Sequence, residues 1–200
     1  QALSARIRPH FLFNSLNGVL GVIRSDPRRA ERALEELADL FRVLMRENRE
    51  LVPLGDEMAL CERYIDLERL RLGERLAVRW HLPVSGTPEH AALMRAQVPA
   101  LLLQPLLENA VYHGIEPSEN GGTVRIRFAR NADELHIDLV NPCGRAGGVG
   151  GNHMALANIR ERLSLYYDLE ARLETKEESS PDGGCEYRVH IVLPCRSMTL

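Results

Sequence analysis

Apolar residues near the start of the chain recur with the period of an α-helix. Steps of four and three separate Leu12, Leu16, Val19 and Ile23, which is the spacing of a seam that packs on other helices. Asp26 and Pro27 then predict an N-cap and the first residue of a second helix. One face of that second helix carries Ala30, Ala33, Leu34, Leu37, Phe41 and Leu44.

These two stretches predict an antiparallel helical hairpin joined by a short turn. A hairpin cannot bury both faces of its helices, so a second copy is expected to complete a four-helix bundle. A third helix is expected over about Asp56 to Leu72. The chain is therefore predicted to begin with a helical region.

The apolar period changes to two after Ala77, where Val78, Trp80 and Leu82 alternate as in a β-strand. The run "VPALLLQPLLENAVYHG" predicts a buried helix with Pro99 near its start and Gly114 as its stop. Later segments predict a hairpin, a helix and two further strands: "TVRIRFAR" with "ELHIDLVN", then "MALANIRERLSLYY", "ARLETK" and "CEYRVHIVLP".

This order of elements predicts an α+β chain with two domains. The boundary is expected near Gly73 to Ala77, which gives a helical region over residues 1–75 and a two-layer α/β sandwich over residues 76–200.

Composition narrows the possible functions. The net charge is -3 and the sequence pI is about 6.2, which argues against direct nucleic-acid binding. No apolar run approaches the roughly 18 residues that cross a bilayer. Four cysteines without CxxC spacing favour scattered buried thiols in a reducing compartment. Because the chain opens on Gln1, we expect an excised cytosolic part of a longer protein.

The stretch "RPHFLFNSLN" places His10 next to Pro9 in otherwise apolar surroundings. Pro9 is expected to start a helix or to kink it. Asn14 lies one turn beyond His10 on the same face and can hydrogen-bond one imidazole nitrogen, which leaves the other nitrogen as a nucleophile. A capping turn with an incidental histidine is the alternative for a lone His.

Glu108 and Asn109 interrupt the apolar run, and His113 follows one turn after Asn109. A polar stripe at the helix surface would explain an isolated pair. However, a Gly-rich stretch from Gly144 to Gly151 precedes a helix, and helix N-termini bind anions. Oxygen donors beside such a site suit Mg²⁺ with nucleotide phosphates.

These motifs together resemble the LytS-type sensor histidine kinases, in nearly the whole chain and in the family's order. "RPHFLFNSLN" is similar to the phosphoacceptor box, and "VPALLLQPLLENAVYHG" to the N box. "PLGDEMALCERYIDLERLRLGERL" resembles the connecting helix, and "NHMALANIRERL" the second glycine box. The resemblance implies a homodimer, a Bergerat-type ATP-binding sandwich, ATP with Mg²⁺, and a LytTR-type response regulator as partner. It also implies a membrane sensor region ahead of this cytoplasmic part, in an inner-membrane protein.

The resemblance also assigns roles to residues. His10 would be the phosphoacceptor, with Asn14 beside it, and Asn109 the magnesium ligand. Glu108 would assist the metal or polarise water, and Asn141 would read the adenine amino group. The rest of the nucleotide pocket would include His113, Gly148, Gly150, Gly151, His153, Leu156 and Asn158, while Arg160 is equally well a surface charge.

Two departures from the family pattern open alternatives. His153 and Ala155 stand where glycines are expected, and Asn141 offers an amide in place of a carboxylate. A dimer with a vestigial nucleotide site, which controls its response regulator by docking or dephosphorylation, is the main alternative. A non-kinase Bergerat ATPase has no use for "PHFLFN" and ranks last.

Overall fold

The computed structural model describes residues 9–45, 50–131, 133–143, 149–179 and 184–195, with the backbone alone at residues 9, 10 and 149–154. The helical elements are α1 (Pro9–Val22), α2 (Pro27–Leu44), α3 (Leu54–Leu72), η1 (Gly73–Arg75), α4 (Pro88–Met94), α5 (Leu103–Ala110), the π-helix η2 (Val111–Ile115) and α6 (Val149–Tyr167). The strands are β1 (Leu51–Pro53), β2 (Leu76–His81), β3 (Gln97–Pro99), β4 (Gly122–Asn131), β5 (Glu134–Pro142), β6 (Arg172–Ser179) and β7 (Cys185–Pro194). The predicted α+β class is confirmed.

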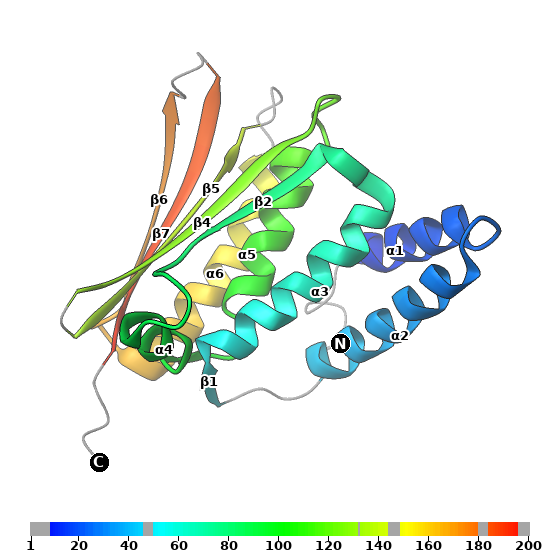
Figure 1. The fold of residues 1–200 in the computed structure, drawn as a ribbon. Coiled ribbons are helices and arrows are strands. Elements are labelled where there is room, and N and C mark those ends of the chain that lie inside the picture. The colour runs from blue at the N-terminus through cyan, green and yellow to red at the C-terminus, as the bar shows by residue number, and fades with distance from the viewer. Residues whose placement is uncertain (1–8, 46–49, 132, 144–148, 180–183, 196–200) are drawn as a thin grey trace.

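The elements form successive layers (Figure 1). Five strands form one mixed sheet in the order β2-β4-β5-β7-β6, in which β2 and β4 run parallel and the other neighbours antiparallel. Helices α5 and α6 cover one face of the sheet, α3 lies over α5, and the α1–α2 hairpin packs on the far side of α3. The predicted β4–β5 hairpin and the two later strands are all present.

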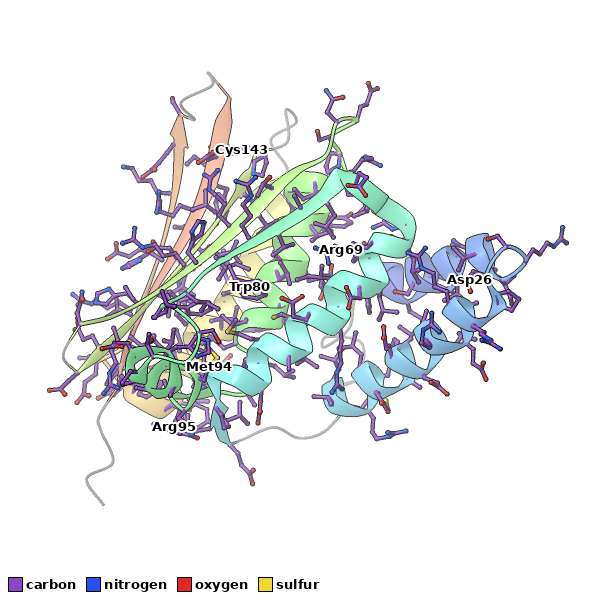
Figure 2. The ribbon with its side chains drawn as sticks, in the orientation of Figure 1. Asp26, Arg69, Trp80, Met94, Arg95 and Cys143 are labelled. Atoms are coloured by element: carbon purple, nitrogen blue, oxygen red, sulfur yellow. A yellow bond between two sulfur atoms is a disulfide. The ribbon has the colours of Figure 1, made fainter. Side chains whose placement is uncertain are left out.

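The turn between α1 and α2 forms as its residues predict. The Asp26 side chain accepts a hydrogen bond from the Arg29 backbone N–H at 3.0 Å, and Pro27 occupies the first turn. Asp26 is labelled at this turn in Figure 2. The side-chain cap and the proline therefore fix the start of α2.

The predicted seam of α1 is only partly correct. Phe11 and Val19 are buried, whereas Leu16 and Ile23 are 37% and 43% exposed. Helix α1 has two apolar faces: one packs on α3, and the other, formed by Phe13, Leu16, Leu20 and Ile23, points away from the rest of the chain. On α2, Leu34 is likewise exposed.

Two parts of the predicted N-box helix differ from expectation. Pro99 lies in strand β3, paired opposite Leu51 of β1, and α5 begins only at Leu103. Gly114 does not stop the helix; it lies within η2, where a Cβ atom would come within 2.5 Å of the Asn141 amide nitrogen and 2.6 Å of the Pro142 carbonyl oxygen. The glycine is therefore needed for close approach to β5. Tertiary contacts caused both differences.

The cysteine prediction is wrong for one pair. Cys143 and Cys185 form a disulfide, because the antiparallel pairing of β5 and β7 brings their Cα atoms to 5.1 Å. Cys143 is labelled near the end of β5 in Figure 2. Cys61 is a fully buried thiol, as expected, and burial raises its pKa well above the usual value.

A buried carboxylate from α3 holds the start of α5. Glu57 is 3% exposed, and its two oxygens accept the backbone N–H groups of residues 101–103 at 2.6, 2.8 and 3.0 Å. Arg162 of α6 donates to the carbonyls of Ala100 and Leu101 in the same turn. Burial raises the pKa of Glu57, and the three N–H donors and Arg162 oppose that rise. Leu101 has a φ of 58°, so this turn requires outside support.

Replacing Glu57 by glutamine should lower the free energy of unfolding by about 2–4 kcal/mol. One amide oxygen cannot accept all three N–H groups, and the amide NH₂ would face backbone donors. Urea denaturation followed by circular dichroism measures the loss. The exposed Glu119→Gln is the control and should change stability by less than about 0.5 kcal/mol. Equal stability of the two variants would contradict the assigned cap.

Candidate active site

The residues predicted for nucleotide binding lie on elements that pack together. Helix α5 contacts β5 and α6, and η2 contacts β5. Glu108, Asn109 and Asn141 are 8%, 6% and 4% exposed, while His113 of η2 is half-buried. Polar side chains this deeply buried need partners or a function. The fold thus gathers the N-box residues and the end of β5 in one region.

Glu108 faces α1, the helix that contains His10. It lines a small cavity together with Phe11 and Asn14 of α1, and it accepts a hydrogen bond from the Gln104 amide at 3.3 Å. Asn109 is not among the residues that line this cavity, because successive helix residues project about 100° apart. Glu108 and Asn109 therefore serve different sides of α5.

Asn14 has a partner that its sequence position did not predict. Its amide nitrogen lies 3.4 Å from Glu116 Oε1, beyond the end of η2. His10 belongs to the first turn of α1, and its side chain lies outside the described residues. The predicted contact between Asn14 and the His10 ring therefore stays a prediction.

Asn141 ends β5 directly against η2. Its amide nitrogen donates to the Pro142 carbonyl at 2.8 Å, and Gly114 packs on the same two residues. This orientation leaves the amide oxygen as the atom that could accept from an adenine amine. The role predicted for Asn141 in reading the adenine amine stays a prediction.

The second glycine box belongs largely to a helix. We expected a Gly-rich loop up to Gly151, but α6 begins at Val149, so Gly150, Gly151 and His153 lie in its first turns. The residues that follow favour helix, and hydrogen bonding extends the helix back through the glycines. Gly148 and the side chain of His153 lie outside the described residues. Leu156 is buried in the core, whereas Asn158 and Arg160 are exposed.

The donor set suits Mg²⁺ bound with a nucleotide. Among the described residues, no group of three His, Cys, Asp or Glu side chains could hold a metal alone. Mg²⁺ commonly takes one or two protein oxygens and completes its shell with phosphates and water. Asn109 offers one amide oxygen in a nearly buried position, which fits that pattern.

A polar group on α3 was not predicted from the sequence. Tyr64, Glu68 and Arg71 share a face with steps of four and three, and all three line the cavity beside Glu108. Polar residues at helical spacing within an apolar helix were the available signal. Burial of Glu68 to 3% exposure makes this group part of the site's surroundings.

Comparisons with known proteins agree with this arrangement. Residues 1–76 match the family model "Histidine kinase". The sensor histidine kinase BtsS of Escherichia coli (strain K12) is 33% identical over 178 residues, which cover 86% of this chain and 30% of BtsS. YesM of Bacillus subtilis (strain 168), also a sensor histidine kinase, is 29% identical over 98% of this chain and 33% of its own length. The sensor protein LytS of Streptococcus mutans is 28% identical over 86% of this chain and 31% of its own length.

The comparisons thus indicate the class of sensor histidine kinases. This chain is similar to that family over most of its length, and its resemblance to the LytS type is confirmed. The chain spans about a third of the length of these curated relatives. Among the described residues, no helix combines the length and apolar character needed to cross a membrane.

Replacing Asn141 by aspartate should destabilise the fold by about 1–3 kcal/mol at neutral pH. The carboxylate would be buried against the Pro142 carbonyl, so it would gain a charge and lose a donor. Protonation restores a donor, so the loss should shrink near about pH 4. Denaturant titrations at the two pH values measure this, with the exposed Asn120→Asp as control. A loss that does not depend on pH would contradict the assigned hydrogen bond.

Proposed function

We propose that this chain is the catalytic core of a sensor histidine kinase that transfers the γ-phosphoryl group of ATP to His10. From phosphohistidine the group would pass to an aspartate of a LytTR-type response regulator that controls transcription. The similarity to sensor histidine kinases supports the class of activity. The roles of the individual residues are our proposal.

The observation that carries the proposal is the position of Glu108. Glu108 lines the same cavity as Phe11 and Asn14, which follow His10 in the first turns of α1. The cavity measures about 10 Å³, so the side chains around it are closely packed. A carboxylate of the N box therefore lies beside the proposed phosphoacceptor turn of its own chain.

The proposed chemistry uses both nitrogens of the His10 ring. One nitrogen attacks the γ-phosphorus with its lone pair, and the bond from that phosphorus to the leaving ADP oxygen breaks. The attack places positive charge on the ring, so the proton on the other nitrogen becomes more acidic and passes to Glu108. Mg²⁺, held through Asn109, would neutralise charge on the phosphates. Asn141 would accept a hydrogen bond from the adenine amine.

Dimerisation is the second part of the proposal. The outward face of α1 exposes Phe13 and Leu20 to 64% each, and Leu34 of α2 is 43% exposed. Contiguous apolar side chains of this kind favour burial against another surface. A second copy of the hairpin would cover them in a four-helix bundle.

The remaining parts of the proposal rest on the resemblance. The helical region would cover residues 1–75 and the ATP-binding sandwich residues 76–200, with the boundary after η1. Histidine kinases generally dimerise and pair with response regulators. We infer attachment to a membrane through other segments of the whole protein, with this region in the cytoplasm.

Replacing His10 by glutamine should abolish transferable label from γ-labelled ATP while folding and dimerisation persist. Replacing Glu108 by glutamine should slow labelling by about 10²-fold, because proton removal would be lost. Acid-labile, base-stable radioactivity measures the phosphohistidine. The exposed His81→Gln is the control and should label like the wild-type chain. Full labelling of the His10 variant would exclude it as the phosphoacceptor.

Replacing Asn109 by alanine should abolish Mg²⁺-dependent ATP binding, because the metal would lose its protein oxygen. Its amide is nearly buried, so we expect a loss of about 1 kcal/mol of stability and no collapse of the fold. Calorimetric titration with and without Mg²⁺ tests this, with the exposed Asn131→Ala as control. Unchanged affinity would assign Asn109 a structural role only.

The same experiments distinguish the docking alternative. A wild-type chain that binds no ATP, forms no phosphohistidine and still dephosphorylates its response regulator would support that alternative. The third possibility, a non-kinase ATPase, would hydrolyse ATP without labelling His10.

A further inference from the structure

An ion-pair cluster connects α3, the end of η2 and α1. Arg71 Nη2 lies 2.6 Å from Glu68 Oε2, and Arg71 Nη1 lies 2.8 Å from Glu116 Oε1. The same Glu116 oxygen accepts from the Asn14 amide at 3.4 Å. The Arg71 guanidinium thus joins α3 to the end of η2, and Glu116 extends the connection to α1.

The cluster is largely removed from solvent. The side chain of Glu68 is 3% exposed, and those of Arg71 and Glu116 are 23% and 24% exposed. Burial alone would lower the pKa of Arg71, but Glu68 and Glu116 together raise it. A buried ion pair contributes little net stability compared with apolar packing, because its charges lose hydration. The planar guanidinium of Arg71, held by Glu68 and Glu116, does constrain how α3 lies against the end of η2.

The contacts of this cluster also constrain the backbone of α1 next to His10. Phe11, the next residue, packs its ring 5.1 Å from the ring of Tyr64, measured between centroids. Asn14 holds the next turn through Glu116. Both contacts line the cavity of about 10 Å³ that also contains Glu108, so α1 has little freedom to shift there.

We propose that Arg71, held between Glu68 and Glu116, is a positioning residue that fixes the phosphoacceptor helix against Glu108 of the same chain. It acts through Glu116, Asn14 and the packed Phe11–Tyr64 pair, and it does not touch the phosphoryl group. This inference rests on the proposed function. It adds that labelling of His10 depends on a cluster outside the nucleotide site.

The test is the labelling rate of the Glu116→Gln chain at saturating ATP. Glutamine preserves size and an acceptor for Asn14 but removes the charge that holds Arg71. We expect the rate of His10 labelling to fall about tenfold, because small misplacements of reacting groups are costly. The KM for ATP should stay within about twofold of the wild-type value, because the nucleotide contacts lie elsewhere.

Arg71→Lys provides a second variant in case the first folds poorly. Lysine keeps the charge but cannot contact two carboxylates with a planar fork, so labelling should again slow while ATP affinity persists. The matched control is Glu186→Gln, which breaks an ion pair of 2.6 Å with Arg125 on the sheet. This control should label at the wild-type rate.

The outcomes distinguish the positioning role of Arg71 from the proposed kinase function. Normal labelling by both cluster variants, or a rate loss matched by an equal loss of ATP affinity, overturns the positioning role. If Glu108→Gln loses label and Glu116→Gln does not, only the positioning role fails. If the wild-type chain forms no phosphohistidine, both proposals fail.

Discussion

The site depends on the contact between Glu57 and the first turn of α5. A helix leaves its first N–H groups without partners inside the helix, and eight residues are too few for α5 to form stably alone. Glu57 accepts the N–H group of Leu103 and those of the two residues before it, and Arg162 binds the carbonyls of Ala100 and Leu101 in the same turn. Helices α3 and α6 therefore set where α5 begins. Because α5 carries Glu108 and Asn109, the same contact sets where both side chains point.

Helix α3 has a larger part in the architecture than a connector between domains. It packs on the α1–α2 hairpin along one side and on α5 along the other (Figure 1). Its Glu57 fixes the beginning of α5, and its Arg71 binds Glu116 beyond the other end. One rigid helix thus contacts both ends of the N-box segment. A displacement of α3 would change the relation between α1 and α5, on which the proposed phosphoryl transfer depends.

Features encoded by neighbouring residues could be predicted from the sequence. The Asp26–Pro27 cap, the β4–β5 hairpin and the last two strands depend on local propensity and period, and all of them form. The class of the protein was also predictable, because the motif around His10 and the N box are specific. Propensity and hydrophobic period predict an element correctly where its formation depends only on residues close in the sequence.

The features that were not predicted correctly from the sequence depend on contacts between segments that are distant along the chain. Pro99 joined a strand because β1 approaches it, and Gly114 is required by the proximity of β5. The partner of Cys143 lies 42 residues away and follows from strand pairing. The Glu68–Arg71–Glu116 cluster spans 45 residues between Arg71 and Glu116. No local pattern specifies such pairs.

The three buried glutamates of this region have different roles because their carboxylates have different surroundings. Glu57 accepts three backbone N–H groups and is committed to the helix start. Glu68 is bound by the Arg71 guanidinium at 2.6 Å, so its charge is compensated within α3. Glu108 accepts from a neutral amide at 3.3 Å and borders the cavity beside α1. Glu57 and Glu68 are thus committed to fixing the start of α5 and to holding Arg71. Glu108 is the one of the three that α5 brings to the cavity beside α1, which is why the proposed proton exchange with His10 is assigned to it.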